Sequence, residues 1–378
     1  MDEQHDVVVV GAGVIGLACA WRAAQRGLDV CVLERDRPGA GASEVAAGML
    51  VPATEVDFGE EELVRLKLAS SELYPAFVDE VEEASALHTG YERDGALYVA
   101  FDRDEVEALR RLSEVQRSLG LEAEWLLPTA CRDLEPGLSA ACAGGIFAPG
   151  DGQVDPSALV EALAVSAERA GARIESEAEV VAIIVEGSGV AGVETRNGRC
   201  YGAGQVVVAS GCWSGVAEWL PEGVRPPVRP VKGQVVHLRG PSGSLAKRPV
   251  RTEAVYIVPR SDGRVVVGAT VEEHGFDVSV TAGAVHELLR EAYRALPDVA
   301  ELEFVGAQAG LRPGTPDNGP VIGTTALEGL VLATGHYRNG ILLAPITAEA
   351  VAAILAGQEV NPVAAPFVPG RFERLEVG

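Results

Sequence analysis

The chain has 378 residues, of which 55 are acidic and 31 basic, giving a formal net charge of −24, and 47% are hydrophobic. This hydrophobic content is sufficient for one large domain or two intergrown domains, each with its own core. The excess of negative charge argues against nucleic acid or an anionic membrane as a partner, because both would be repelled.

Two further properties limit the class of protein. The six cysteines form no CxxC pair and show no metal-site spacing with the six histidines, so we expect no metal site. The sequence begins without a basic leader followed by an apolar segment, and it contains no apolar stretch of roughly twenty residues. We therefore expect a cytoplasmic protein without a membrane anchor.

The first predicted elements are a buried parallel strand at Val7–Val10 and an alanine-rich helix, joined by the turn GAGVIG. Gly11 permits the tight turn, Gly13 lets backbone N–H groups approach a pyrophosphate, and Gly16 lets the helix pack close to the strand. A second strand ends at Glu34, whose carboxylate is placed to accept hydrogen bonds from a ribose. The pattern predicts a dinucleotide site; the alternative is a glycine-rich turn of another α/β fold.

The next segments are predicted to be a loop and a long helix. Small residues at 39–48 would let the backbone pass close to a flat ligand, although a flexible loop has the same composition. We expect Ser43 to cap the helix that follows it. Residues 59–86 have a helical apolar pattern that includes Leu73, and Pro75 is expected to break this helix into two pieces.

The rest of the chain alternates between two kinds of pattern, in this order: a strand at 95–101, a helix at 104–119, a helix at 156–170 capped by Asp155, strands at 180–185 and 205–211 with a hairpin at Asn197–Gly198, period-two strands and one helix within 226–304, a buried strand from 329, and an apolar helix ending at Leu355. The period-two region predicts a mostly antiparallel sheet backed by a helix. The alternation indicates two interleaved domains.

Four segments carry a family resemblance: DVVVVGAGVIGLACAW at the start, SEVAAGML after the second strand, GDGQVDP in the middle, and GLRP with ATGHYRNGILLAP near the end. From Asp6 to about Gly357 the chain resembles the flavin-dependent superfamily that includes D-amino-acid oxidase and sarcosine oxidase, and within it the glycine oxidases. The resemblance implies an α/β fold, with a Rossmann-like FAD-binding domain at 1–85, 145–222 and 306–378. An α+β substrate domain on a mostly antiparallel sheet would comprise 86–144 and 223–305.

The resemblance also implies an extended, non-covalent FAD, since no cysteine follows Cys212, where relatives with covalent flavin carry one. The implied FAD contacts, including the motif glycines, are Gly11, Gly13, Val14, Ile15, Gly16, Glu34, Arg35, Ala42, Ser43, Ala47, Gly48, Met49, Val180, His336, Tyr337, Arg338, Asn339, Gly340, Ile341 and Leu342. Arg312 and Arg338 match the carboxylate-binding arginines of the family, and Tyr256 matches its substrate-side tyrosine.

The chemistry of flavin-dependent amino-acid oxidation suits this set, because the substrate must be held rigidly from its carboxylate. A planar guanidinium binds a carboxylate in a bidentate fork, and a phenol adds a directional hydrogen bond. No protein base is needed if the neutral amine binds and hydride leaves directly. Each residue has a second interpretation: Arg312 as a surface residue of a proline-rich loop, Tyr256 as a packing residue, and His336 as a histidine satisfied by a neighbouring turn.

The expected reaction is oxidative deamination of glycine, and of sarcosine or small D-amino acids, to an imine or 2-oxo acid and ammonia. Oxygen would be reduced to hydrogen peroxide, and the imine would serve thiamine thiazole synthesis. Ala254 stands where the glycine oxidases have a histidine, which leaves the preferred amine open. The alternatives are a dehydrogenase with another electron acceptor, a non-catalytic FAD-binding subunit of a heteromeric oxidase, and a nicotinamide dehydrogenase. The resemblance further implies a homo-oligomer such as a tetramer.

Overall fold

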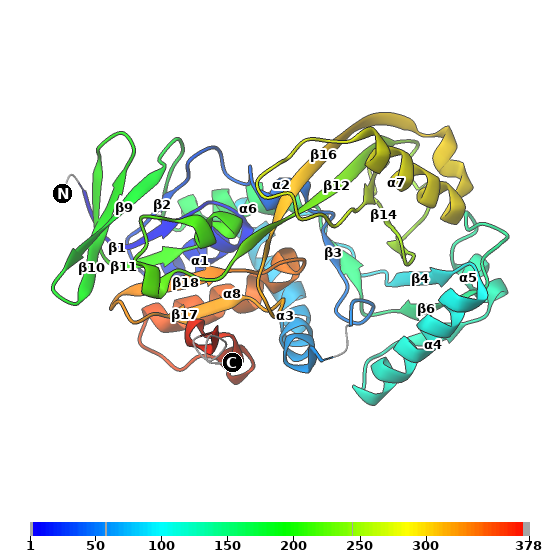
Figure 1. The fold of residues 1–378 in the computed structure, drawn as a ribbon, viewed down its shortest axis with the longest axis horizontal. Helices are drawn as coiled ribbons and strands as arrows, with labels where there is room; N and C mark the ends of the chain where they lie inside the picture. The colour runs from blue at the N-terminus through cyan, green and yellow to red at the C-terminus, as the bar shows by residue number, and fades with distance from the viewer. Residues whose placement is uncertain (1–2, 57–58, 244, 373–378) are drawn as a thin grey trace.

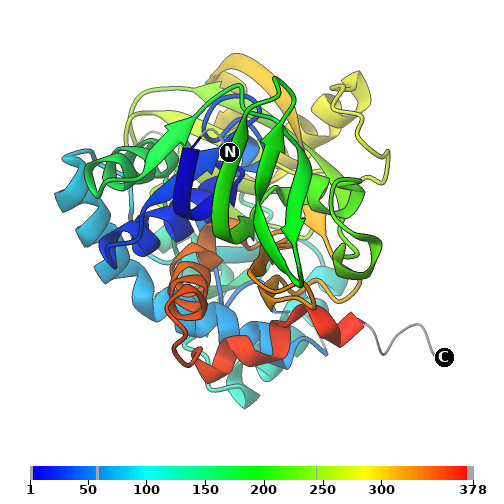
Figure 2. The ribbon, with the colours of Figure 1, turned by 90° about the vertical axis from the view of Figure 1, so that its left-hand side faces the viewer.

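A computed structural model describes residues 3–56, 59–243 and 245–372. The chain forms two lobes that lie side by side, with the long strands β12 (Arg229–Arg239) and β16 (Glu303–Gly314) rising along their junction (Figure 1). The amino terminus lies at the far end of the first lobe, beside the hairpin of β9 (Val180–Glu186) and β10 (Gly189–Thr195) (Figures 1 and 2).

The first lobe is organised around an eight-stranded, mainly parallel sheet. Its main order is β17-β18-β11-β1-β2-β8, and β10 and β9 extend it from β11. Besides β9 and β10, its strands are β1 (Glu3–Val10), β2 (Val30–Leu33), β8 (Arg173–Glu175), β11 (Cys200–Val208), β17 (Val321–Thr324) and β18 (Leu330–Thr334).

The central strand β1 is buried on both faces, and this explains its run of four valines. Val7 and Val9 belong to the core formed with the helices, whereas Val8 and Val10 belong to a second core on the opposite face. All four lie at 7% exposure or less. The helices of the first core pack on one another and are α1 (Val14–Gln25), α3 (Glu61–Ser85), α6 (Pro156–Arg169) and α8 (Gly340–Leu355).

The second lobe is built on another eight-stranded sheet, in the order β16-β12-β15-β14-β13-β4-β6-β5. Its pairs are antiparallel except for β13 with β4. Besides β12 and β16, the lobe contains β4 (Ala96–Ala100), β5 (Glu124–Leu126), β6 (Gly144–Ala148), β13 (Val250–Arg251), β14 (Tyr256–Pro259), β15 (Arg264–Gly268), α4 (Arg103–Ser118), α5 (Pro128–Leu134) and α7 (Ala282–Ala295).

Short elements complete the chain. They are α2 (Ala42–Val45), the paired strands β3 (Met49–Leu50) and β7 (Gly152–Gln153), and five 3-10 turns at Gly211–Val216, Glu222–Val224, Pro297–Glu301, Pro362–Phe367 and Pro369–Phe372.

The predicted fold class is confirmed, since a parallel-type sheet with a helical layer alternates along the chain with a mostly antiparallel sheet. Asp155 caps α6 as expected, accepting hydrogen bonds from the N–H groups of Ser157 and Ala158. Residues 306–314 and 145–148 belong to strands of the second sheet. A division by sheet membership would therefore move them to the substrate domain, and the domain boundaries remain a prediction.

Three local predictions are wrong. Pro75 does not break α3, which continues from Glu61 to Ser85 because its apolar side is buried on both sides of the proline, at Leu66 and Phe77. Leu73 faces outward and is 38% exposed. Ser43 does not cap the helix in which it lies; that helix begins after Gly41 without a side-chain cap.

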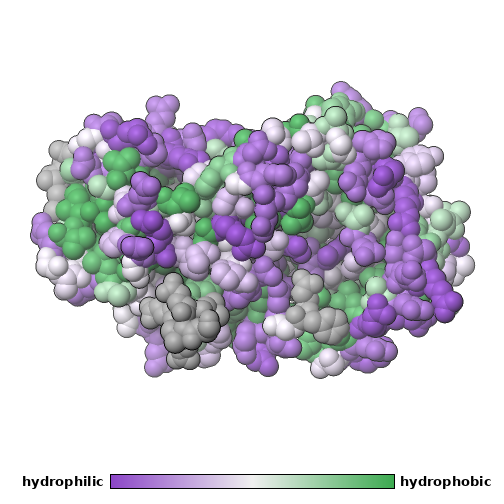
Figure 3. Space-filling model, in the orientation of Figure 1, coloured by the Kyte–Doolittle hydropathy of each residue, from purple (hydrophilic) through white to green (hydrophobic). Residues whose placement is uncertain are grey.

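The molecular surface seen in Figure 3 is largely hydrophilic, with scattered hydrophobic patches. This agrees with the acidic composition. Among the described residues no helix is both long enough and apolar enough to cross a membrane.

Substitution of Gly16 by alanine tests the close approach of α1 to the turn after β1. The new Cβ would lie 1.9 Å from the carbonyl oxygen of Gly11, a backbone atom, so the helix must move. We expect Gly16→Ala to lower the free energy of unfolding by about 2 kcal/mol or more, the usual cost of overpacking, and to weaken retention of the FAD that the family resemblance implies. Thermal unfolding and the bound-FAD absorbance measure both effects.

Gly283→Ala in α7 is the matched control, because a Cβ there meets no atom within 4 Å. It should leave FAD retention unchanged and raise the stability slightly, as alanine is favoured over glycine in a helix. Equal stability of the two variants would contradict the packing role of Gly16.

Candidate functional site

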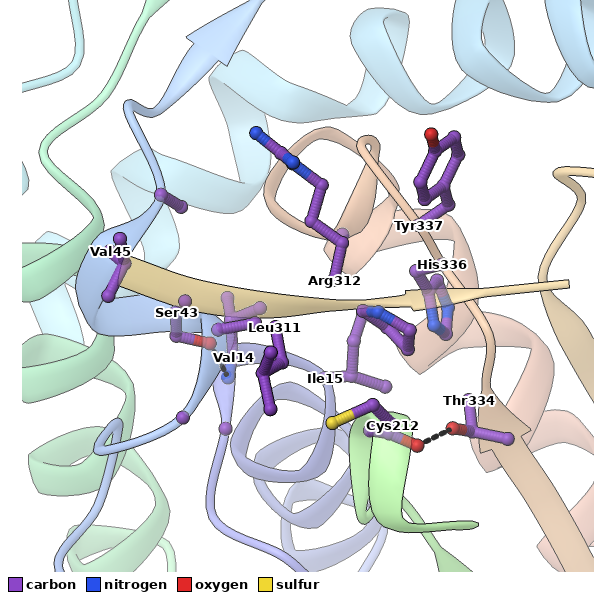
Figure 4. Close-up of a pocket in the computed structure, with 18 of the residues that line it drawn as sticks. Val14, Ile15, Ser43, Val45, Cys212, Leu311, Arg312, Thr334, His336 and Tyr337 are labelled. Carbon is purple, nitrogen blue, oxygen red and sulfur yellow. Dashed lines mark hydrogen bonds between the residues drawn. The ribbon is translucent and has the colours of Figure 1, made fainter. Parts of the chain in front are cut away.

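A cavity of about 630 Å³ extends from the β1–α1 turn to the second sheet, and residues of both lobes line it. One end is bordered by Glu34 and by residues 178–181, and the other by Tyr256 and Arg312. Figure 4 shows Leu311 and Arg312, which are consecutive on β16, pointing to opposite sides of the strand. A single elongated site thus connects the two lobes.

The amino terminus of α1 lines the cavity at the point where the glycine motif predicts a phosphate site. Gly11 has φ +106°, which favours glycine, and a Cβ there would lie 2.7 Å from the carbonyl oxygen of Ala209. The N–H of Val14 donates to Ser43 Oγ over 3.1 Å (Figure 4), so Ser43 serves α1 instead of its own helix. The first-turn N–H groups and the positive end of the helix dipole suit an anionic phosphate.

Glu34 lies beside this turn. Its Oε2 accepts a hydrogen bond of 2.8 Å from the N–H of Ala12, and its Oε1 accepts one from the N–H of Asp36. The carboxylate is therefore fixed at the end of β2 and lines the cavity. This position fits a ribose contact, which remains a prediction.

Arg35 and Trp213 form a flat wall near the same end, with the guanidinium carbon 3.8 Å from the centre of the indole ring. Stacking of this kind restricts the guanidinium to one plane. Trp213 was not predicted as a site residue. No local motif marks it, because it comes from the 3-10 turn that follows β11.

The loop between β18 and α8 borders the middle of the cavity. His336 is buried, its Nε2 lies 3.0 Å from Thr347 Oγ1, and burial lowers its pKa to about 3, so the ring is neutral. Tyr337 adopts φ +46°, a left-handed conformation that is unusual for tyrosine, and its N–H donates to the carbonyl of Pro313. The amino terminus of α8, at Gly340, lines the cavity and directs a second helix dipole toward it.

Register in the second sheet places Tyr256 and Arg312, the residues predicted to bind the substrate, on one face. Tyr256 on β14 is opposite Gly268 on β15, and Gly268 is opposite Val235 on β12. Because side chains alternate along a strand, Gly233 shares the face of Val235. Gly233 pairs with Gly310 on β16, and Arg312, two residues after Gly310, lies on this face as well. All six residues line the cavity.

Two glycines on this face make room for the functional side chains. A Cβ on Gly233 would lie 2.3 Å from Nη1 of Arg312, and a Cβ on Gly268 would lie 2.4 Å from the hydroxyl of Tyr256. The guanidinium and the phenol therefore lie flat over bare backbone. Glycine inside a strand often marks such a close approach, and the segments VKGQ and VVVGAT carried that signal in the sequence.

Arg312 and Tyr256 are held in different ways. Nη1 of Arg312 donates to the carbonyls of Thr270, at 3.1 Å, and Lys232, at 3.3 Å. Burial raises the pKa of Tyr256, with a smaller lowering by the Arg312 charge, so the phenol keeps its proton as a donor. Arg312 lies on a strand, which is inconsistent with a surface loop. Arg338 is exposed, with its Nη2 3.3 Å from the hydroxyl of Tyr337.

The structure brings most of the predicted site residues together. Of the twenty residues implied for FAD, seventeen line the cavity, and the three that do not are Gly16, Asn339 and Leu342. Tyr256 and Arg312 line it too. The cavity-lining residues that were not predicted include Trp213, Gly233, Gly268, Arg251 and Glu55.

Asp151, in the GDGQVDP segment, supports the loop that carries Glu55. Its two carboxylate oxygens accept hydrogen bonds from the N–H groups of Ala53 and Thr54 and from the Thr54 hydroxyl, at 2.9–3.2 Å. Complete burial raises its pKa from 3.8 to about 7, although these donors favour the ionised form. The loop beside the cavity thus rests on a carboxyl group that titrates near neutrality.

No group of three or more histidine, cysteine, aspartate or glutamate side chains among the described residues could hold a metal ion. Of the six cysteines, Cys212 lines the cavity, and burial raises its pKa to about 12, so it remains a thiol. The two helix termini, the glycine turn and the carboxylate of Glu34 fit a dinucleotide cofactor.

Comparison with known proteins supports the same interpretation. A model of the DAO family, described as FAD-dependent oxidoreductases, matches residues 6–354. Glycine oxidase of Geobacillus kaustophilus is 37% identical over 369 residues, covering 97% of both chains. The crystal structure of glycine oxidase from Geobacillus kaustophilus superposes on this chain with a TM-score of 0.91 and 38% sequence identity. The match covers 98% of this chain and 99% of that one.

The bifunctional protein ThiO/ThiG of Trichormus variabilis is 37% identical over 375 residues. The match covers 98% of this chain and 55% of that protein, so this chain spans about half the length of such relatives.

Gly233→Ala tests how Arg312 is accommodated. The new Cβ must displace a guanidinium, the mobile end of a side chain, so we expect little change in stability but about tenfold weaker binding of acetate, as a charge-assisted hydrogen bond is misplaced. Titration of the flavin absorbance with acetate measures the affinity. Gly306→Ala on β16, the strand that carries Arg312, is the control, because a Cβ there meets nothing within 4 Å. Equal acetate affinity in both variants would refute the steric argument.

Asp151→Asn tests the titration of the buried carboxyl group. Because the folded protein binds this proton more tightly than the unfolded chain, its contribution to stability is full below pH 3.8 and is lost as the pH rises through about 7. Asparagine mimics the protonated acid and does not titrate. The Tm of the wild type minus that of the variant should therefore fall between pH 5 and pH 8. A difference that does not change with pH would disprove the assignment.

Proposed function

Because the chain belongs to the DAO family of FAD-dependent oxidoreductases, we propose that it oxidises glycine and passes the electrons to oxygen. Glycine, O2 and water would give glyoxylate, ammonia and hydrogen peroxide. The observation that carries the proposal is the placement of Arg312 and Tyr256 on the cavity face of the second sheet, in the same cavity as the phosphate-binding turn.

The family resemblance is confirmed, and FAD is the cofactor. When bound, FAD accepts the hydrogen and two electrons that leave the substrate carbon. The α1 terminus and Glu34 would hold its adenosine diphosphate part, and the loop from His336 to Ile341 would border its ring. The individual contacts are part of the proposal.

The residues of the chain supply substrate position. Arg312, fixed by two backbone carbonyls, offers its free edge to the substrate carboxylate, and Tyr256 adds a hydrogen bond from its protonated hydroxyl. Arg338, at the exposed side of the cavity, would add charge as the substrate enters. His336 is neutral and already hydrogen-bonded through Nε2, so it would contribute shape and polarity instead of a titrating charge.

The range of amines follows from the size of the cavity wall beside Tyr256. Ala254 lines the cavity with only a methyl group. We therefore include sarcosine and small D-amino acids among the substrates. The likeness to ThiO/ThiG supports a role for the product in thiamine thiazole synthesis, and we further propose a cytoplasmic homo-oligomer.

Anaerobic addition of glycine to the yellow holoenzyme tests the reaction. We expect the flavin to lose its absorbance and to recover it on admission of air, with peroxide formed in step. Bleaching without recovery would favour a dehydrogenase with another acceptor, and failure of every amine and amino acid to bleach would favour a non-catalytic FAD-binding subunit.

Arg312→Ala should raise the KM for glycine by about a hundredfold through loss of the bidentate fork. Arg338→Ala should raise it by about tenfold, because an exposed charge is screened by solvent. Peroxide production at increasing glycine concentration measures both values. An unchanged KM in Arg312→Ala would exclude that residue as the carboxylate anchor.

A further inference from the structure

Arg251 is a cavity-lining arginine that the proposed reaction does not use. It ends β13 and is directly opposite Tyr256 of β14. Directly opposed residues of an antiparallel pair point to the same face, about 5 Å apart at Cβ. The Cβ atoms of Arg251 and Tyr256 therefore lie side by side on the cavity face, in the same cross-strand row as Gly268.

The guanidinium of Arg251 has few contacts with the rest of the protein. Its Nη1 donates to the carbonyl of Thr54 over 2.9 Å and lies 3.4 Å from Oε1 of Glu55. Its guanidinium carbon lies 4.8 Å from the ring centre of Tyr98. No other described residue accepts a hydrogen bond from this guanidinium or forms an ion pair with it. The side chain is 23% exposed and lines the cavity.

This part of the cavity contains more arginines than carboxylates. Arg312 and Arg338 account for the carboxylate of an amino acid, which leaves Arg251 with Glu55 as its single ion-pair partner among the described residues. Glu55 is 20% exposed and its loop is anchored by backbone contacts with Asp151. An ion pair of this exposure is readily rearranged, because its net stabilisation is small.

The wall next to this pair has room for a larger substrate. Ala254, three residues after Arg251, lines the cavity with a methyl group, and the backbone around it is fixed by Thr252, whose hydroxyl accepts hydrogen bonds from the N–H groups of Ala254 and Val255. The short side chain and the rigid turn leave the space beside Tyr256 available to a substituent on the amine or on the α-carbon.

We propose that Arg251 is a specificity-determining residue that binds a second anionic group of the substrate, so that the enzyme accepts glycine derivatives with two carboxylates. This inference rests on the proposed function. Oxidation of iminodiacetate, which carries the second carboxylate on its amine substituent, would proceed with one O2 and one water to glycine, glyoxylate and hydrogen peroxide. D-Aspartate carries it on the α-carbon and would give oxaloacetate, ammonia and hydrogen peroxide.

Glu55 and Arg251 should then have opposite effects on specificity. Arg251 attracts the second carboxylate, whereas Glu55 repels it and competes for the same guanidinium. Arg251→Gln should lower the ratio of kcat/KM for the dicarboxylate to that for glycine by about tenfold or more, as a charge-assisted hydrogen bond is lost. Glu55→Gln should raise the same ratio. A merely structural role of the pair would lower activity toward all substrates in both variants.

The experiment measures initial rates of peroxide formation with glycine, iminodiacetate and D-aspartate for the wild type and both variants. Malonate and acetate, titrated against the flavin absorbance, give binding affinities that do not depend on turnover. Arg196→Gln is the matched control. Arg196 forms an ion pair with Glu179, and both residues line the cavity near the adenosine end. This control should leave every ratio unchanged.

The outcomes separate the two proposals. If glycine is not oxidised by the wild type, the proposed function fails. If glycine is oxidised but the dicarboxylate ratios and the malonate affinity do not fall in Arg251→Gln, the specificity assignment fails. A response to iminodiacetate alone, or to D-aspartate alone, would support the assignment and show from which substrate position the second carboxylate reaches Arg251.

Discussion

The alignment of strands in the second sheet is the constraint on which the substrate side of the cavity depends. Arg312, Tyr256 and Arg251 come from three different strands, and they face the cavity together because each pairs in the register observed. A slip of one residue in β15 would turn Gly268 to the opposite face and put the side chain of Val267 or Ala269 opposite Tyr256. The side chains proposed to bind the substrate are therefore positioned by backbone pairing and by the two glycines on the same face.

Electrostatics divides the cavity into parts with different preferences. The positive ends of α1 and α8 and the arginines favour anionic groups. The carboxylates of Glu34 and Glu55 lower the positive potential near the two ends of the cavity. The loop that carries Glu55 is supported by Asp151 in the middle of the chain and contacts Arg251 in the second sheet.

Much of the cofactor end could be predicted from the sequence, because its determinants are local. Gly11 and the valines of β1 follow one another in a motif whose geometry depends on near neighbours in the chain. The role of Ser43 could not be found in this way, since its partner Val14 lies on another helix. Arg251 and Glu55 were missed for the same reason: they meet only when β13 is in place. Pro75 shows that tertiary packing can override a helix-breaking residue.

The order of strands in the first sheet has a consequence for biosynthesis. β1 is made before its neighbour β11, which lies nearly two hundred residues later, and α8, which packs on α1, is made later still. Until then, the valines of β1 lack the surfaces that bury them. Long-range pairing of this kind folds slowly and exposes apolar strands during synthesis. The cavity, which Gly340 and Ile341 of α8 help to line, therefore cannot be complete until that helix has been made.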